Sequence, residues 1–204
     1  CYCRADFRAP AEVLRVLDDA QARLGPIDIL VNNAVTRHIA PIERFPVEAW
    51  DDALAINLSA PFHAIRHLLP GMRARGFGRI VNMTSVYAVQ AVAQRIDYST
   101  TKAAISGMTR AVAAETAGSG ITCNAVCPGS VLTPGIEARL KKLMAETGLT
   151  RDAATARFLE GKQPGGRFIP LEHVADLVAF LCGASAAGIN GATYTMDCGW
   201  SVTT

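Results

Sequence analysis

Apolar residues recur along the chain with two spacings, and the alternation of these spacings predicts alternating helices and strands. Apolar positions three and four residues apart predict helices over 11–24, over 46–70, over the alanine-rich run 98–117 and over 171–181. Short apolar runs predict parallel strands at 28–31, 79–83, 121–126 and 193–196, the first two of them buried. Strands that alternate with helices are typical of an α/β fold, so we expect a doubly wound, parallel sheet of the Rossmann type.

The segment 130–169 follows a looser pattern than the rest of the chain. Its spacing predicts two short amphipathic helices at about 135–146 and 151–160, and a glycine-rich stretch follows at 161–166. These glycines neither follow a strand nor open a helix, which argues against a phosphate-binding loop and favours a hinge. We therefore expect a single domain over 1–204, in which residues 130–169 form a lid that closes over the substrate.

Composition and charge narrow the possible functions. The chain has 204 residues, half of them hydrophobic, which suffices for one buried core. Its formal net charge is only +2 and its basic residues form no tract, so nucleic acid is not an expected partner. No apolar run is long enough to cross a bilayer, so we expect no membrane partner either.

The chain has six cysteines, and their placement favours free thiols. No Cys-x-x-Cys pair occurs, and a large apolar core needs no disulfides. Cys123, Cys127 and Cys182 lie in apolar stretches and are expected to be buried thiols in a reducing cytoplasm. No His or carboxylate cluster has metal-ligand spacing, so no metal is expected.

Polar residues follow three of the predicted strands. Asn32–Asn33 ends the first, Ser85 comes shortly after the second, and Pro128–Gly129 closes the third. In open α/β sheets ligands bind beyond the carboxyl ends of the strands, so this rim is the expected site. Asn57 lies on the apolar stripe of a predicted helix, and it is either hydrogen-bonded within the core or recruited to that site.

Tyr98 and Lys102 are the pair with the clearest chemistry. They stand four residues apart in a predicted helix with about 3.6 residues per turn, so both side chains lie on one face. A phenol with an ordinary pKa of about 10 is a poor base at neutral pH, but a neighbouring ammonium favours the phenolate. The pair is therefore a candidate proton donor and acceptor, although the same spacing also occurs by coincidence.

Five motifs occur along the chain in a fixed order, namely Asn32-Asn33-Ala34, Asn57 in Asn-Leu-Ser, Ser85, Tyr98-x-x-x-Lys102 and Pro128–Gly129. In this order and at these spacings, they together resemble the short-chain dehydrogenases/reductases. The resemblance covers the chain from about Asp6 onward. The family's first strand, glycine-rich turn and following strand–helix unit have no counterpart here. Because the chain begins at Cys1, close to the expected end of a strand, we expect the front of a longer protein to be absent from this sequence.

The resemblance implies hydride transfer between a nicotinamide cofactor, NAD with NADP not excluded, and a secondary alcohol or ketone. It implies that Tyr98 is the general acid and base, and that Lys102 assists Tyr98 and holds the nicotinamide ribose. It further implies that Ser85 hydrogen-bonds the substrate oxygen and that Asn57 continues a proton relay through water. The implied cofactor contacts, besides Tyr98 and Lys102, are Asp6 and Phe7 near the adenine, and Asn33, Pro128, Gly129, Val131 and Thr133.

Within the family, several stretches resemble the D-3-hydroxybutyrate dehydrogenases, among them 40–43, 115–118, 120–125, 131–134, 162–164 and 199–200. That subgroup oxidises a small β-hydroxy acid with NAD and holds its carboxylate with polar side chains. The expected substrate-binding residues depart from the subgroup at most positions. They are Arg37 and Arg139 in place of glutamine, Arg95 in place of lysine, Tyr87 in place of histidine, and the unchanged Ser85 and Trp200.

The arginines change the expected substrate. A guanidinium offers a planar fork of two parallel hydrogen bonds to an anion, which glutamine does not. Three arginines around a small pocket over-neutralise one carboxylate, so we expect a small hydroxy or keto acid that is larger or more anionic than 3-hydroxybutyrate. Alternatively, one or two of these arginines point to solvent or pair with acids. Arg139 is the first candidate for such a role, because it lies at the edge of an apolar stripe. Ser130 replaces a tryptophan of the subgroup, and for Val35 and Cys198, which replace glycines, the sequence offers no physical account.

Two further functions remain open at this stage. The same fold and motif residues serve reductases of acyl-thioester or sugar ketones, because they do not select a substrate. A non-catalytic relative would use the fold as a binding module, which the complete set of Asn57, Ser85, Tyr98 and Lys102 disfavours. The resemblance also implies a homotetramer.

Overall fold

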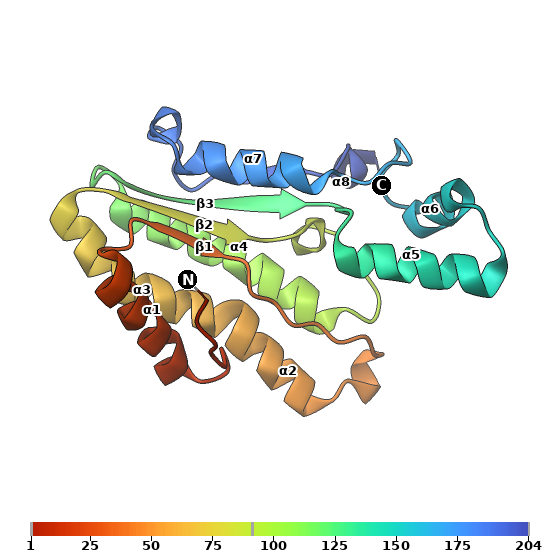
Figure 1. Cartoon of the computed structure of the whole chain (residues 1–204), viewed down its shortest axis with the longest axis horizontal. Coiled ribbons are helices and arrows are strands. Elements are labelled where there is room, and N and C mark those ends of the chain that lie inside the picture. Colours follow the sequence, from red (N-terminus) through yellow and green to blue (C-terminus); the bar gives the residue numbers. More distant parts are fainter. Residues whose placement is uncertain (1, 91, 204) are drawn as a thin grey trace.

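Four parallel strands form the centre of the structure, a computed structural model that describes residues 2–90 and 92–203. The strands are β1 (Ile29–Asn32), β2 (Gly78–Met83), β3 (Ile121–Pro128) and β4 (Thr193–Met196), in the spatial order β1-β2-β3-β4. Neighbouring strands are parallel, and Ile80 of β2 is paired with Leu30 on one side and Cys123 on the other. The predicted α/β class with a parallel sheet is confirmed (Figure 1).

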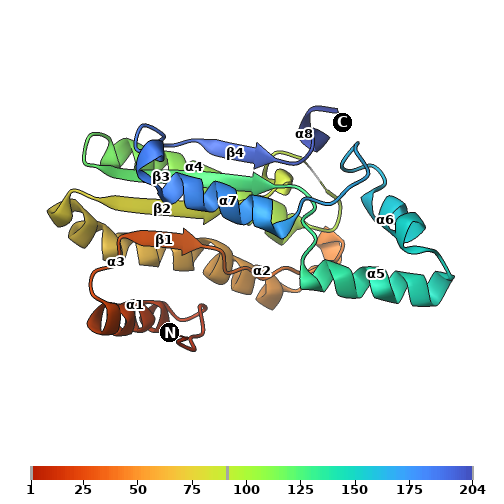
Figure 2. The same ribbon diagram turned by 45° about the horizontal axis from the view of Figure 1, so that its top comes forward.

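Helices cover both faces of the sheet (Figures 1 and 2). α1 (Pro10–Leu24), α3 (Ala60–Arg75) and α4 (Ile96–Thr116) lie on one face, and α7 (Leu171–Cys182) lies on the other. Successive side chains of a strand point to opposite faces, and this divides the core into two layers. Ile80 packs in a cluster with Ile65 and Met72 of α3, whereas its neighbour Val81 packs with Leu181 of α7.

The helix predicted to end at Pro70–Gly71 has different bounds in the structure. α2 (Val47–Leu54) continues through a π-helical turn, Ala55–Ser59, into α3, and Pro70 lies inside α3. The helix ends at Arg75, where Gly76 takes a left-handed φ of 66°. A proline removes one backbone donor from a helix, and here it does so on an exposed side, so the helix continues past it.

Two residues expected in the core are exposed because of where their elements lie. β1 is the edge strand of the described sheet, so Val31 is 41% exposed and the prediction of a buried strand is wrong. Phe62, expected on the apolar stripe of its helix, is 50% exposed. It borders a groove between α3 and α4 together with Met108, instead of facing the sheet core.

The segment predicted as a lid forms two helices beyond the carboxyl end of β3 (Figure 2). They are α5 (Pro134–Thr147) and α6 (Arg151–Leu159). The two ends of the segment meet, because Val131 and Ile169 form a parallel bridge and the N–H of Leu132 donates to the carbonyl of Ile169 over 3.1 Å. The buried Gln163 side chain adds to this closure by accepting a hydrogen bond from the N–H of Ser130. The segment is therefore a helical unit anchored at both ends, and its closing motion stays a prediction.

The cysteine predictions are confirmed for two of the three apolar positions. Cys123 and Cys127 are buried free thiols, whereas the free Cys182 is only partly buried. Cys1 lies outside the described residues. Across the described residues, no helix has both the length and the apolar character needed to span a bilayer, and no three His, Cys, Asp or Glu side chains gather as metal ligands.

Candidate active site

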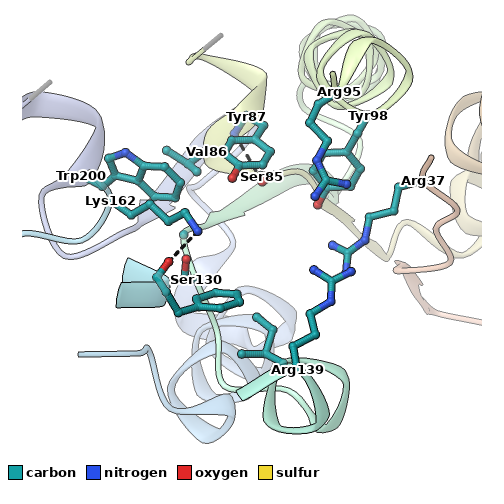
Figure 3. Close-up of a pocket in the computed structure, with 13 residues that line it drawn as sticks. Arg37, Ser85, Val86, Tyr87, Arg95, Tyr98, Ser130, Arg139, Lys162 and Trp200 are labelled. Atoms are coloured by element: carbon teal, nitrogen blue, oxygen red, sulfur yellow. Dashed lines mark hydrogen bonds between the residues drawn. The ribbon is translucent and has the colours of Figure 1, made fainter. Parts of the chain in front are cut away.

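A cavity of about 120 Å³ lies at the carboxyl end of the sheet, between the sheet and the lid helices (Figure 3). It brings together the loop after β1, the segment after β2, the start of α4, the lid and α8 (Trp200–Thr203). All residues that the sequence proposes for substrate binding lie in its wall. The lining residues are Arg37, Ser85, Val86, Tyr87, Arg95, Tyr98, Gly129, Ser130, Ile136, Arg139, Phe158, Lys162 and Trp200.

Tyr98 and Lys102 occupy the beginning of α4, and the structure brings them together as the helical spacing predicts. Nζ of Lys102 lies 5.6 Å from the centroid of the Tyr98 ring. The Lys102 side chain is buried, and its ammonium donates a hydrogen bond of 2.6 Å to the backbone carbonyl of Met83 at the end of β2. Burial lowers the pKa of Lys102 to about 8. The lysine is thus fixed between the strand end and the phenol ring.

Ser85 directs its hydroxyl to the cavity from the segment after β2. The residue is buried and its backbone is extended, with φ −163° and ψ 157°. Its Oγ accepts a hydrogen bond of 3.3 Å from the N–H of Tyr87 and so caps the short 3₁₀ helix Val86–Ala88. This cap sets the position of the hydroxyl, while the O–H proton stays available to a ligand.

Three aromatic rings form one wall of the cavity. The Tyr87 ring stands edge-to-face against Tyr98, with centroids 6.0 Å apart, and against Trp200, with centroids 5.5 Å apart. Burial raises the pKa of Tyr87, so this phenol stays protonated and can donate a hydrogen bond. The aromatic wall therefore connects the proposed catalytic tyrosine to the carboxyl-terminal helix α8.

Asn57 is buried in the π-helical turn, and its side chain is hydrogen-bonded to other elements. Oδ1 accepts from the N–H of Thr36 over 2.8 Å, and Nδ2 donates to the carbonyl of Thr36 and to Oγ1 of Thr101. The amide therefore ties the loop before Arg37 to α4. Of the two readings left open by the sequence, the structural one holds for this side chain, and the irregular π turn is a feature common at functional sites.

Four cationic side chains line the cavity: Arg37, Arg95, Arg139 and Lys162. No carboxylate is among the described residues that line it. Burial, and to a smaller extent the neighbouring Arg37, lower the pKa of Arg95. Burial is also the main reason why the pKa of Lys162 is lowered, and the charges of Arg95 and Arg139 lower it further. Nη1 of Arg95 is buried and has no hydrogen-bond partner within the described part of the chain. Such an arrangement leaves strong hydrogen-bond donors that suit an anionic ligand.

The structure adds residues that the sequence patterns do not single out. Lys162 lies in the turn after α6 and reaches the cavity, although the sequence pattern around it indicates only a hinge. Asp97 is fully buried and holds the loop of Arg37 through the N–H of His38. An acidic residue directly before the proposed catalytic tyrosine is the one signal that points to it. For Lys162 the only signal is that the stretch 162–164 resembles the D-3-hydroxybutyrate dehydrogenases.

The residues expected near the adenine border a second, open cavity of about 760 Å³ beside the carboxyl end of β1. Asp6, Phe7 and Val35 are in its wall. Arg8 forms a fork with Asp6, and its hydrogen bonds hold the pKa of the Asp6 carboxyl at about 2. Each of the two Asp6 carboxylate oxygens accepts two hydrogen bonds from Arg8, which donates through its backbone N–H, Nε and Nη2. Phe7 also borders an adjoining apolar cavity together with Asn33.

The remaining cofactor candidates lie where β3 ends. Pro128 is the last residue of β3, and Val131 forms the bridge to Ile169. Oγ1 of Thr133 accepts from the N–H of Ile136 over 3.3 Å and so caps α5. Gly129 is closely packed, because an added Cβ would come within 3.1 Å of both Asp197 Cα and Gln163 Oε1.

Comparisons with known proteins agree with this geometry. The family model described as "Enoyl-(Acyl carrier protein) reductase" matches residues 1–201. The chain is 40% identical over 199 residues to "D-beta-hydroxybutyrate dehydrogenase" of Cupriavidus necator, which covers 98% of this chain and 77% of the relative. It is also 40% identical over 197 residues to the protein of the same name from Rhizobium meliloti, with 97% and 76% covered.

The fold comparison leads to the same group of proteins. The structure of "L-Sorbose reductase from Gluconobacter frateurii complexed with NADPH and L-sorbose" superposes with a TM-score of 0.91. The sequences are 32% identical, and the match covers 98% of this chain and 76% of that chain. The family match over residues 1–201, the 40% identity to the hydroxybutyrate dehydrogenases and the pairing of Tyr98 with Lys102 all indicate one family. The chain belongs to the short-chain dehydrogenase/reductase family of oxidoreductases.

Proposed function

We propose that this oxidoreductase interconverts the secondary alcohol and the ketone of a small hydroxy acid, 3-hydroxybutyrate or a more anionic analogue, with NAD or NADP. The observation that carries the proposal is one cavity in which Tyr98 and Ser85 meet Arg37, Arg95 and Arg139. The two hydroxyl groups suit a carbinol or carbonyl oxygen. The guanidinium groups suit the acid, because each can form two parallel hydrogen bonds to a carboxylate.

The proton chemistry follows from the side chains that border the cavity. In the oxidation direction, the Tyr98 oxygen takes the proton of the substrate hydroxyl as its C–O bond becomes C=O, and in the reverse direction it returns the proton. The Lys102 ammonium beside the ring stabilises the phenolate. Ser85 donates a hydrogen bond to the substrate oxygen and holds it in place.

Asn57 contributes through its main chain. Its side chain already bonds Thr36 and Thr101, so its amide serves to hold the loop and the helix. A proton relay to solvent, as the family resemblance implies, therefore uses a water molecule bound to the Asn57 carbonyl in the irregular π turn. This assigns both a structural and a relay role to one residue.

A bound nicotinamide dinucleotide accepts or supplies the hydride. We propose that Asp6, Phe7 and Asn33 hold its adenine half, next to the cavities that they border. At the nicotinamide half, Tyr98 and Lys102 contact the ribose. The residues at the end of β3 complete the proposed set, namely Pro128, Gly129, Val131 and Thr133. NAD is the expected cofactor, and NADP is the alternative that the assay below distinguishes.

The rival substrates explain the cavity less well. An uncharged sugar ketone would leave the partly buried guanidinium of Arg95 without an anion, and burying unpaired charge is costly. The ketone end of an acyl thioester is uncharged as well, so it would leave the same cationic group without an anion. A non-catalytic binding module would require no phenol–ammonium pair beside the cavity.

Assembly and compartment follow the family resemblance. We propose a homotetramer, and the exposed apolar groove between α3 and α4, with Phe62 and Met108, is a surface that a second copy would cover. Buried free thiols at Cys123 and Cys127 suit a reducing, cytoplasmic setting. Sedimentation analysis of the complete protein tests the assembly.

The test of the function is an absorbance assay for the reduced cofactor. The complete protein is incubated with 3-hydroxybutyrate and larger hydroxy acids, with NAD or NADP in parallel. Tyr98→Phe removes the proton acceptor, and we expect the rate to fall by about 10²–10⁴-fold while cofactor binding persists. Tyr194→Phe, outside the cavity, is the matched control and should leave the rate unchanged. A folded, cofactor-binding protein that turns over no hydroxy acid would contradict the proposal.

A further inference from the structure

The two sides of the cavity differ in chemistry. Figure 3 shows the three arginines on one side and Val86, Lys162 and Trp200 on the other, with the hydroxyl of Ser85 between them. We call the side of Val86, Lys162 and Trp200 the apolar side. Because the substrate oxygen binds at Ser85, one substituent of the carbinol carbon faces the guanidinium groups and the other faces the apolar side.

The charge of Lys162 does not make the apolar side a site for an anion. Its Nζ donates a hydrogen bond of 2.7 Å to the carbonyl of Phe158 and lies 4.3 Å from the centroid of the Phe158 ring. A carbonyl oxygen and the face of an aromatic ring are both electron-rich, so they hold the ammonium within the wall. The partly buried lysine adds its hydrocarbon stem to the surface beside Trp200. The substituent that faces this side is therefore uncharged.

Ser130 leaves space on the apolar side. The residue is buried in the cavity wall, and its N–H donates a hydrogen bond to Oε1 of Gln163, the neighbour of Lys162. Its carbonyl accepts a hydrogen bond of 3.0 Å from the N–H of Ile169. Because both backbone groups are held, the backbone cannot move inward to fill the volume that a larger side chain would occupy. That volume stays part of the cavity, whereas the tryptophan of the subgroup that the sequence resembles would fill it.

We propose that the substrate carries an uncharged alkyl chain longer than methyl on its carbinol carbon, and that this chain binds on the apolar side against Ser130, Val86 and Trp200. This inference rests on the proposed function and deepens its substrate class. The carboxylate still binds to the arginines, and the bond changes remain those of the alcohol–ketone reaction. Ser130 is thus a specificity-determining residue, because its small side chain admits the alkyl chain.

Three 3-hydroxy acids that differ only in the alkyl chain test the inference, namely 3-hydroxybutyrate, 3-hydroxypentanoate and 3-hydroxyhexanoate. With the complete, cofactor-loaded protein, we expect kcat/KM to rise by about fourfold per added methylene, because each CH₂ is removed from water. Ser130→Leu fills the space and should remove this rise, whereas Ser130→Ala leaves the space open and should retain it. Ser185→Leu, at an exposed position outside the cavity, is the matched control and should retain the rise as well.

Butyrate and hexanoate have no hydroxyl to oxidise, so their binding gives a readout that is independent of turnover. Calorimetry of the wild-type protein should show that hexanoate binds about 10-fold more tightly than butyrate, and Ser130→Leu should remove the difference. This measurement on the wild-type protein does not depend on the folding of any variant. Equal affinity for the two acids would overturn the inference.

The outcomes separate this inference from the proposed function. If 3-hydroxybutyrate is oxidised and kcat/KM of the wild-type protein stays level or falls with chain length, the inference fails while the hydroxy-acid function stands. If hexanoate is preferred in binding but no hydroxy acid is turned over, the proposed function fails while the apolar side keeps its role. An equal loss for all three substrates in Ser130→Leu would overturn the role of Ser130 in specificity.

Discussion

The buried carboxylate of Asp97 accepts a hydrogen bond from the backbone N–H of His38, with 2.8 Å between Oδ2 and the nitrogen. The bond ties the loop that carries Arg37 to the first turn of α4. On the other side of Arg37, the side chain of Asn57 both accepts from and donates to the backbone of Thr36. Arg37 is itself exposed, so these two buried side chains hold its position at the cavity through the main chain.

Asp97→Ala should therefore misplace Arg37. We expect KM for the anionic substrate to rise by about 10-fold with kcat changed by less than about threefold, because proton transfer is not touched. The unpaired N–H of His38 should lower the free energy of unfolding by about 1–3 kcal/mol. Asp97→Asn retains an acceptor oxygen and should restore most of KM. A loss in kcat at unchanged KM would instead assign Asp97 to the chemistry of Tyr98.

Arg95 is the arginine most closely committed to the cavity, since its Nη1 is buried without a partner among the described residues. Arg95→Ala should raise KM for the anionic substrate by about 10–100-fold, the value of one charged hydrogen-bond pair. Arg95→Lys should recover part of the loss, because an ammonium retains the charge but not the fork. Arg157→Ala, on the exposed surface of α6, is the control. Steady-state kinetics measure each variant, and an unchanged KM for Arg95→Ala would exclude an anion-binding role.

Lys102 should make the fold less stable at neutral pH while it serves the reaction. Burial lowers the pKa of Lys102 from 10.5 to about 8, so the folded state loses this proton at lower pH than the unfolded chain. The cost of burying the charge is therefore fully present below pH 8, and it is relieved as the pH rises toward 10.5. Lys102→Met should abolish activity and yet raise the unfolding free energy at pH 7 by about 2 kcal/mol, after subtracting the lost hydrogen bond to Met83.

Denaturant unfolding at two pH values checks this sign. The stability gain of Lys102→Met over the wild type should shrink as the pH rises from 8 to 10.5 and reverse sign above 10.5, where the wild-type lysine is neutral in both states and still donates to Met83. A variant that is less stable than the wild type at pH 7 would mean that the hydrogen bond to Met83 outweighs the burial of the charge.

Gln163 should control how firmly the lid is anchored. Its amide accepts from the N–H of Ser130 and donates to the carbonyl of Arg167 over 2.6 Å, in a fully buried position. Gln163→Leu leaves both backbone groups unpaired at a cost of about 1–3 kcal/mol each. We expect faster amide hydrogen exchange confined to residues 130–169 and a lower kcat/KM. Gln163→Glu, which retains the acceptor, should show a smaller change; faster exchange over the whole sheet would contradict a local role.

Much of the fold was predictable because secondary structure follows local spacing. The four strands and the helices that separate them lie close to where the apolar periods place them, since each period depends only on neighbouring residues. The errors are tertiary in origin. Val31 is exposed because β1 is the edge of the described sheet, and Phe62 is exposed because it borders a groove between helices. The local pattern shows neither which strand lies at the edge of the sheet nor which helices border a groove.

The active site divides in the same way. Tyr98 and Lys102 could be paired from the sequence, because helix geometry fixes residues four apart on one face, and the rim at the strand ends follows from parallel topology. Arg37, Arg95 and Arg139 come from three separate segments, and only the packing of the lid against the sheet directs all three into one cavity. Lys162 and Asp97 become functional candidates for the same reason: a charge acquires its role from the groups around it, and the folded chain alone supplies those groups.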